Sequence, residues 1–397
     1  MSISKRAIRL ISALMTLAVM MTALAGLSVT ASAASKWDGY TKISSATDLL
    51  KMKNSDGKFY LTKDIDMKSY GKWDEAIRFS GTLDGNGFSV KNLTSEQFGL
   101  FYSLTDATVR NLGITNVKID TKKSVGALTN GCKNSAIENC YVTGSIKSQG
   151  HAGGLVGYDT GTTKGNNTLT NCVNMASVES TKYGAYGIIV SEHTDTLKNC
   201  VNYGNITAKT TTAGICNRAG VELISCYNLG KIAESEKGWG GIACYVTGKL
   251  ENCATSTSKF THSMPANCTE TADVNVSKST FKKADTYVGF DFGKTWTISS
   301  KINSGHPVLT IMLKDYNGSR PTASNPAGSY KNSVKVELTT NLENGVIRYT
   351  TNGKTPTASS AKYTKPLTIT KDTTVKAAVF VNGVRAKVIT LKYTIKK

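Results

Sequence analysis

Proline is missing from most of this chain, because all six prolines lie at or after Pro265. Proline removes a donor from a β-ladder, so a proline-free body rich in Gly, Asn, Thr and Ser suits continuous strand pairing. The sequence also has no Cys-x-x-Cys pair among its nine cysteines. This absence argues against a zinc site, whose ligands cluster around one point.

Long apolar runs are scarce as well. The one present is "LISALMTLAVMMTALAGL", which follows Lys5, Arg6 and Arg9 and precedes "ASAAS". This order predicts a secretory signal peptide over residues 1–33, with an uncleaved anchor as the alternative, since the run is long enough to span a bilayer. We expect a secreted, extracellular monomer without stable membrane insertion after cleavage; association with the cell wall is left open.

Acidic residues are outnumbered, and the formal net charge is +20. Residues 321–397 hold 13 Lys+Arg and 3 Asp+Glu. A strongly basic exported protein is expected to meet polyanions such as acidic polysaccharides, wall polymers or anionic surfaces, although the charge could serve solubility alone. We expect no nucleic-acid partner, because the sequence has no reading helix and no basic–aromatic motif.

Two phrases recur in step along the body of the chain. One is a glycine followed by two mostly apolar residues, at Gly99, Gly126, Gly154, Gly187, Gly214 and Gly241. The other is apolar-x-Asn-Cys or a close variant, as in "VKNL", "VRNL", "IENC", "LTNC", "LKNC", "LISC" and "LENC". A unit of about 27 residues is too small to bury its own apolar face, so the repeat predicts a solenoid of stacked units. Short strands between Gly/Asn turns, without leucine-rich phrases, favour a parallel β-helix of about seven coils.

Stacking gives each repeated position a physical meaning. Asparagine, which tolerates a left-handed backbone, is expected in a corner column, with Ser225 replacing one member: Asn92, Asn111, Asn139, Asn171, Asn199 and Asn252. The next residues are expected to form an apolar column: Leu93, Leu112, Cys140, Cys172, Cys200, Cys226 and Cys253. The leucines at cysteine positions predict buried free thiols, with disulfides as the alternative in an exported chain.

The phrases "FSGTLDGNGFSVKNL", "FGLFYSL" and "AGGLVG" resemble secreted bacterial GLUG-type repeat proteins. That resemblance implies a right-handed parallel β-helix, in shape like pectate lyases and adhesins. "VIRYTTNGKTPTASSAKYTKPLTI" and "TTVKAAVFVNG" resemble the chitobiase/β-hexosaminidase C-terminal type of domain, which implies an immunoglobulin-like sandwich. Asn-Gly hairpin turns are expected in "TNGK" and "VNGV". The predicted fold is therefore all-β: repeats with an N-terminal capping segment over 34–260, a cap over 261–315 and the sandwich over 316–397.

The candidate ligand-binding residues lie around an irregular coil that carries extra residues, because long loops on a regular scaffold are where function concentrates. They are Tyr158, Asp159, Lys164, Glu192 and His193. We expect no catalytic residue, no metal ligand and no cofactor. Calcium enters only if the chain is an enzyme, with Asp159 and Glu192 as paired carboxylates.

The function expected from these features is a secreted, non-catalytic, adhesin-like protein that binds a glycan or surface polymer. Two alternatives stay open. One is a polysaccharide lyase or glycoside hydrolase that acts on an acidic polysaccharide at the β-helix face; the other is a purely structural extracellular spacer. The identity of the ligand and the functional face are not fixed by the sequence.

Overall fold

The computed structural model describes residues 36–158, 166–190, 195–219, 222–246, 249–256, 277, 279–342 and 344–397. The chain divides into two units, residues 1–40 and 41–397. In the described part of the first unit, the rings of Trp37 and Tyr40 meet edge to face with centroids 5.5 Å apart. The predicted signal peptide, residues 1–33, lies outside the described residues. None of the helices described is long and apolar enough to cross a membrane.

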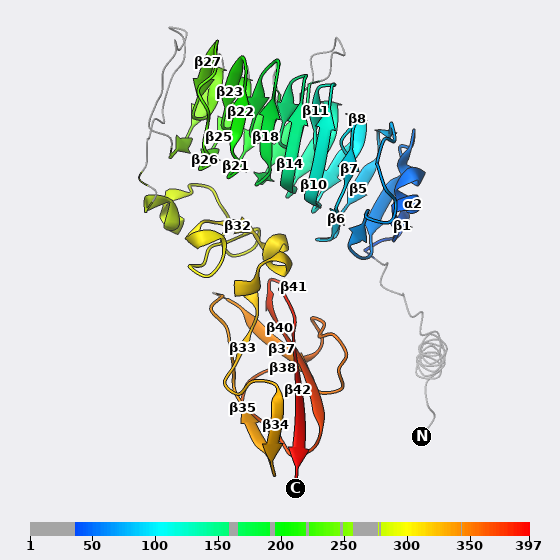
Figure 1. The fold of residues 1–397 in the computed structure, drawn as a ribbon, viewed down its shortest axis with the longest axis vertical. Coiled ribbons are helices and arrows are strands. Elements are labelled where there is room, and N and C mark those ends of the chain that lie inside the picture. Colours follow the sequence, from blue (N-terminus) through cyan, green and yellow to red (C-terminus); the bar gives the residue numbers. More distant parts are fainter. Residues whose placement is uncertain are drawn as a thin grey trace, which may run out of the picture. The chain divides into compact units, whose positions relative to one another are not determined.

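Residues 41–256 form a β-solenoid of about seven turns, as predicted (Figure 1). Parallel strands at equivalent positions of successive coils pair into long sheets. The first sheet contains β1 (Tyr40–Ile43), β2 (Lys58–Leu61), β5 (Thr82–Asp84), β9 (Thr108–Arg110), β13 (Ala136–Glu138), β16 (Thr168–Thr170), β20 (Thr196–Lys198), β25 (Glu222–Ile224) and β29 (Lys249–Glu251). The helical turns α2 (Ala46–Leu49) and η1 (Leu50–Met52) follow β1.

The other sheets complete the coils. The second contains β3 (Ile65–Asp66), β6 (Ser89–Lys91), β10 (Gly113–Thr121), β14 (Tyr141–Ser148), β17 (Val173–Asn174), β21 (Val201–Asn202), β26 (Tyr227–Asn228) and β30 (Ala254–Thr255), flanked by β7 (Thr94–Ser95), β18 (Ser177–Ser180) and β22 (Ile206–Ala208). The third contains β11 (Val125–Gly126), β15 (Ala152–Gly153), β19 (Ala185–Tyr186), β23 (Thr211–Ala213) and β27 (Gly238–Gly240). Shorter sets pair β4 (Arg78–Phe79), β8 (Phe101–Thr105) and β12 (Thr129–Lys133), and β24 (Cys216–Ala219) with β28 (Ala243–Val246).

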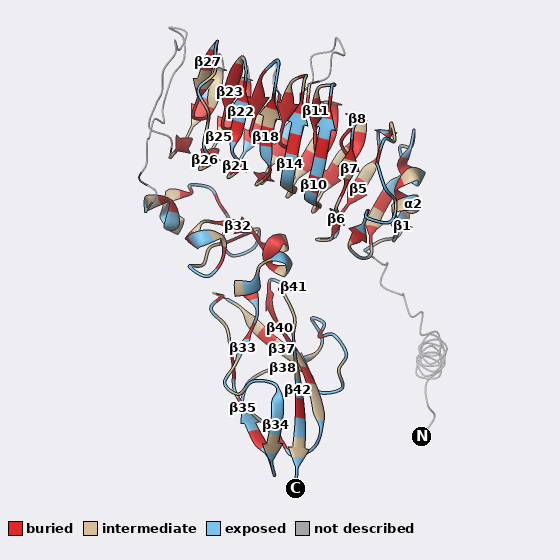
Figure 2. Cartoon of the chain, in the orientation of Figure 1, coloured by how far each residue is buried: buried red, intermediate tan, exposed pale blue. Residues whose placement is uncertain are grey.

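The cysteine column lies in the core inside the coils, where buried residues line every turn (Figure 2). Leu112 and the five cysteines Cys140, Cys172, Cys200, Cys226 and Cys253 are all buried. The eight cysteines of the described part are free thiols. Each column thiol lies within hydrogen-bonding distance of a carbonyl in the preceding coil, as Cys200 Sγ does with Leu169 O at 3.4 Å. The expectation of buried free thiols is confirmed for these residues.

The corner asparagines adopt the left-handed backbone that the sequence predicts, with φ of 54° at Asn111, 52° at Asn139 and 53° at Asn171. Their amides form a directional ladder. Asn171 Nδ2 donates to Asn139 Oδ1 at 3.0 Å, Asn139 Nδ2 to Asn111 Oδ1 at 3.0 Å, and Asn111 Nδ2 to Asp84 Oδ1 at 3.1 Å. The buried Asp84 carboxylate, paired with Arg110 Nε at 2.9 Å, therefore terminates the ladder at its N-terminal end.

The placement of Asn92 and Leu93 in these two columns is wrong. Ser89 pairs with Gly113, which puts Asn92 beside Asn116 rather than Asn111. The reason is that "VKNL" lies on β6 of the second sheet, whereas "VRNL" lies on β9 of the first; β5 pairs with β9, which makes Gly85 the residue equivalent to Asn111. Asn92 belongs instead to a second, more exposed ladder: Asn116 Nδ2 donates to Asn92 Oδ1 at 2.6 Å, and Asn92 Nδ2 donates to Asp66 Oδ1 at 2.7 Å.

The first ladder is interrupted at Ser225, and this break predicts a stabilising substitution. Asn199 is 5% exposed, and its Oδ1 has no hydrogen-bond partner. Ser225→Asn places an amide donor at the next ladder position, where φ is 53° and asparagine is favoured over serine. We expect the free energy of unfolding to rise by about 1 kcal/mol. Urea unfolding measures it, with Ser225→Ala as the control that adds no donor; equal stability of the two variants would contradict the prediction.

Residues 279–320 contain the short helices η2 (Thr280–Lys282), η3 (Ala284–Thr286), η4 (Asn303–Gly305), η5 (Thr310–Asp315) and η6 (Asn317–Ser319), and the pair β31 (Trp296–Thr297) and β32 (Val308–Leu309). Their described contacts lie along the second sheet: Tyr227 OH donates to Thr286 O at 3.0 Å, and Trp296 Nε1 to Asn171 Oδ1 at 3.1 Å. Residues 257–276 of the expected cap lie outside the described residues. The capping role and the domain boundaries stay predictions.

The C-terminal domain is immunoglobulin-like, as predicted. Its sheets contain β33 (Thr322–Ala323) with β36 (Leu338–Thr339), β35 (Val334–Val336) with β39 (Leu367–Ile369), and β34 (Gly328–Lys331), β42 (Ile389–Lys396), β40 (Thr373–Val381), β37 (Val346–Thr350) and β38 (Ala361–Lys362), with β41 (Val384–Arg385) beside β40. Asn382 and Gly383 form the expected hairpin turn, with φ of 49° and 79°. "TNGK" forms no such hairpin, because β37 pairs with the distant β38.

Candidate functional site

Of the predicted ligand-binding residues, Tyr158 lies in the described part. Its side chain is half-buried, and its ring centroid lies 5.4 Å from that of His151. Asp159, Lys164, Glu192 and His193 lie outside the described residues. The structure therefore leaves that set as a prediction and brings a different group of side chains together nearby.

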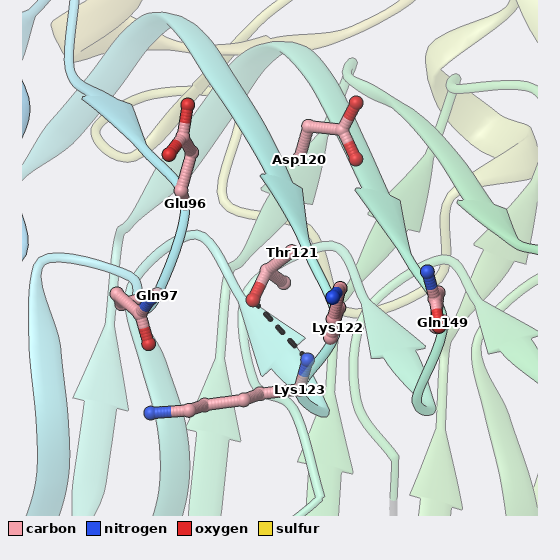
Figure 3. A pocket seen from close by; sticks show the side chains of 7 residues that line it. All are labelled: Glu96, Gln97, Asp120, Thr121, Lys122, Lys123 and Gln149. Atoms are coloured by element: carbon pink, nitrogen blue, oxygen red, sulfur yellow. Dashed lines mark hydrogen bonds between the residues drawn. The ribbon is translucent and has the colours of Figure 1, made fainter.

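A groove of about 540 Å³ opens on the outside of the solenoid. It is lined entirely by polar side chains: Glu96, Gln97, Asp120, Thr121, Lys122, Lys123 and Gln149 (Figure 3). Glu96 and Gln97 follow β7, Asp120 and Thr121 end β10, and Gln149 follows β14. Three successive coils thus contribute to one site.

Strand register explains why these residues meet. Ile119 pairs with Ser95, so Asp120 and Glu96 occupy the same position in neighbouring coils. Gln149 N donates to Thr121 O at 2.9 Å. Gln149, which is one coil further along the chain, therefore lies beside Lys122. Adjacent strands lie about 4.8 Å apart, so carboxylate, ammonium and amide groups line up within reach of one extended ligand.

The charges of the groove are balanced and partly held in place. Glu96 pairs with Lys72 Nζ at 2.5 Å, and this hydrogen bond and charge raise the pKa of Lys72. Lys123 Nζ lies 4.3 Å from the centroid of the Phe98 ring, a cation–π contact. Asp120 is exposed and forms no ion pair with a described residue. Two acids and two lysines therefore give a groove without strong net charge.

The turn that holds Lys123 is fixed by buried hydroxyls. Thr121 Oγ1 accepts from Lys123 N at 3.2 Å, the bond drawn in Figure 3. Ser148 Oγ donates to Lys123 O at 2.6 Å. Because both hydroxyl groups belong to buried residues, the backbone of the turn is set before any ligand arrives.

Aromatic rings continue this surface two residues beyond Gln149. The His151 and Tyr183 ring centroids lie 5.2 Å apart. Tyr183 is 51% exposed, whereas Tyr186 beneath the same turn is buried. Gly184 N lies 3.3 Å from His151 Nδ1, and Tyr183 N donates to Ser180 Oγ at 3.0 Å. The two hydrogen bonds fix the turn that presents an aromatic face beside the polar groove.

This arrangement can hydrogen-bond a hydroxyl-rich ligand and stack a ring against it. Carboxylates and amide oxygens accept, while ammonium and amide groups donate. Within the residues that the structure describes, no group of three or more His, Cys, Asp or Glu is placed to hold a metal ion. The sequence did not reveal this groove, because its lining residues belong to no phrase that recurs from coil to coil. Only the spacing of one coil between Glu96 and Asp120 could have indicated it.

Two family profiles match parts of the chain. The N-terminal region of the M26 IgA1-specific metallo-endopeptidases matches residues 31–144. The chitobiase/β-hexosaminidase C-terminal domain matches residues 325–390 and supports the interpretation of that domain. Each covers a minor part of the chain, so they describe regions rather than the whole protein.

Curated relatives match over similar stretches. Halomucin of Haloquadratum walsbyi is 30% identical over 154 residues, 32% of this chain and 2% of halomucin. The immunoglobulin A1 proteases of Streptococcus sanguinis and Streptococcus pneumoniae are 32% identical over 113 residues and 30% over 128, which cover 26% and 29% of this chain. The chain spans about 6% of the length of each protease. A solved IgA1 protease structure aligns with a TM-score of 0.42 at 19% identity, over 53% of this chain and 19% of that one.

Proposed function

We propose that this chain is an extracellular, non-catalytic polymer-binding protein whose solenoid holds a glycan across the groove between Glu96 and Gln149. The observation that carries the proposal is the convergence of polar side chains from three coils beside the exposed Tyr183 ring. A balanced set of donors and acceptors suits a hydroxyl-rich, uncharged glycan chain better than a polyanion. Tyr183 offers the stacking face that sugar rings use.

Other features support an extracellular, adhesin-like role. The predicted signal peptide directs export, and the repeat phrases resemble GLUG-type proteins. The C-terminal domain matches a profile named after two glycan-active enzymes, chitobiase and β-hexosaminidase. In this proposal Asp159, Lys164, Glu192 and His193, which lie outside the described residues, contribute to binding together with Tyr158. No cofactor takes part.

Removing the Asp120 carboxylate tests the groove. For a neutral glycan found in a glycan-array screen of the full chain, Asp120→Ala is expected to weaken binding about tenfold, because a charge-assisted hydrogen bond is worth about 1.5 kcal/mol. Tyr183→Ala should have a comparable effect through lost stacking. Titration calorimetry measures both dissociation constants.

Asp56→Ala is the matched control, since Asp56 is also an exposed carboxylate of the solenoid but lies outside the groove. It is expected to bind as the unmodified chain does. Equal affinity of Asp120→Ala and the control would contradict the groove. Release of new reducing or unsaturated ends from the bound glycan would contradict the non-catalytic role.

A further inference from the structure

The largest sheet of the C-terminal domain has one face in the core, and much of its other face is exposed, although Ala378 and Phe380 of that face are buried. Val375, Ala377 and Val379 of β40, with Ile347 of β37 and Tyr393 of β42, are buried on the core face. Side chains alternate between faces along a strand, so the residues between them point outward. The outward residues of β42 read Thr390, Lys392, Thr394 and Lys396, all exposed.

Strand register assembles the outward cations into one diagonal stripe. Lys331 of β34 pairs with Lys396 of β42. Lys392 of β42 lies opposite Thr374, two residues before Lys376 on β40, and Lys376 lies opposite Thr390. Thr350 of β37 pairs with Lys376, and Arg348, two residues earlier, pairs with Lys362 of β38. The stripe thus crosses five adjacent strands, about 19 Å at 4.8 Å per strand.

One carboxylate, that of Asp372, lies next to this stripe among the residues that the structure describes, against six cations. None of its five lysines or Arg348 forms an ion pair there. The nearest carboxylate by register is Asp372, whose Oδ1 accepts from Ile395 N at 2.8 Å. Arg348 donates from Nη1 to Ser360 O at 2.7 Å, whereas Lys331, Lys362, Lys392 and Lys396 are exposed.

The rest of the face shows what kind of polymer fits. Threonine and serine hydroxyls separate the cations, as Thr390, Thr394 and Ser329 do. Phe380, an aromatic residue of this face, is buried. A face with charges and hydroxyl groups but no exposed ring recognises charge spacing rather than sugar rings, in contrast to the balanced groove beside Tyr183.

We propose that this lysine stripe is the docking surface for a linear polyphosphodiester, with phosphate groups placed along the diagonal from Lys331 to Lys362. The inference rests on the proposed function in one respect, because it requires the protein to meet an extracellular polymer. It does not depend on the glycan groove. Phosphodiester oxygens accept from ammonium and hydroxyl donors at once. Binding releases counterions, so it weakens steeply as salt rises.

The test uses the full chain and polyglycerol phosphate, with polygalacturonate of equal charge as the second probe. The double variant Lys376→Gln/Lys392→Gln removes the centre of the stripe. It is expected to weaken polyglycerol phosphate binding more than tenfold, and to lower the slope of log Kd against log salt by about 2. Its thermal unfolding midpoint should stay within a few degrees, because neither side chain is buried.

Lys335→Gln/Lys365→Gln is the matched control, since it removes two exposed lysines of the same domain that lie outside the five strands of the stripe. It should weaken binding less than threefold. Equal losses in the two double variants would overturn the stripe, as would equal or stronger binding to polygalacturonate. Asp120→Ala tests the two sites separately. It should lose glycan binding and keep polyphosphodiester binding, so a result against one site leaves the other proposal standing.

Discussion

Replacing Asn202 by alanine is expected to lower the free energy of unfolding by about 3–5 kcal/mol. Asn202 is fully buried and forms four hydrogen bonds. Its Oδ1 accepts from Gly204 N at 3.1 Å and from Asn174 Nδ2 at 2.8 Å, and its Nδ2 donates to Gly204 O at 3.0 Å and Asn228 Oδ1 at 2.8 Å. Alanine removes the side-chain partners of Gly204 N and Gly204 O in a site closed to water, at about 1–3 kcal/mol for each unsatisfied group. Asn174 Nδ2 and Asn228 Oδ1 each lose one of two hydrogen bonds and keep those with Ala176 O and Gly230 N.

Asn116→Gly is the control for this experiment. Asn116 also donates to a neighbouring asparagine, Asn92, but it is exposed, and its φ of 55° suits glycine. Water replaces the lost bond, so the expected cost is below about 1 kcal/mol. Urea unfolding of both variants measures the difference. Similar losses in the free energy of unfolding would show that asparagine–asparagine hydrogen bonds contribute equally at buried and at exposed positions. That result would contradict the prediction, which attributes the larger loss at Asn202 to burial.

The architecture followed from the sequence because stacked coils repeat their chemistry. The step of 27 residues between Gly187 and Gly214 recurs in the register, where Ala185 pairs with Thr212. The repeated asparagines indicated the corner, because the backbone there has a positive φ. Leu112, at a position that later coils fill with cysteine, indicated that this column is buried. Each of these positions is fixed by a local requirement that one residue type meets best.

Where the same phrase occurs on a different sheet, this reasoning fails. Asn92 carries the corner phrase but follows β6 of the second sheet, so the register places it in another ladder. The groove was missed for a related reason: Glu96, Asp120 and Gln149 are outward side chains that packing does not constrain, and no phrase repeats them. Asp159 and Glu192 lie outside the described residues, and their role stays a prediction.

The thiol column is expected to make the fold labile to alkali. Burial raises the pKa of the Cys140 thiol to about 12 and those of Cys200 and Cys226 well above their usual range. For Cys253 the hydrogen bond with Cys226 is the leading cause of the raised pKa, followed by burial. In the unfolded chain a thiol has a pKa of about 8.5.

The sign of the effect follows from these pKa values. Below pH 8.5 both states keep the thiol protons, and the stabilisation is fully present. Above it the unfolded chain releases protons that the native chain retains, so stability falls until the folded pKa is reached. Each thiol lowers the stability by about 1 kcal/mol between pH 8.5 and 9.5, and by about 1.4 kcal/mol per pH unit above that, so four lower it by about 4 kcal/mol over the first unit. That loss approaches the total stability of the less stable domains.

Urea unfolding of the reduced chain between pH 8 and 10 measures this slope before most tyrosines ionise. Replacing Cys140, Cys200, Cys226 and Cys253 together by alanine should reduce the slope to about a third, the part due to Cys216 and Cys244, whatever the stability of that variant at pH 8. The single variant Cys140→Ala should remove about a sixth of the slope, because burial also raises the pKa values of the Cys216 and Cys244 thiols, and it serves if the quadruple variant does not fold. An unchanged slope in either would mean that the native column admits water and ionises with the unfolded chain. The described structure, in which Cys200 and Cys226 are fully buried, predicts the opposite.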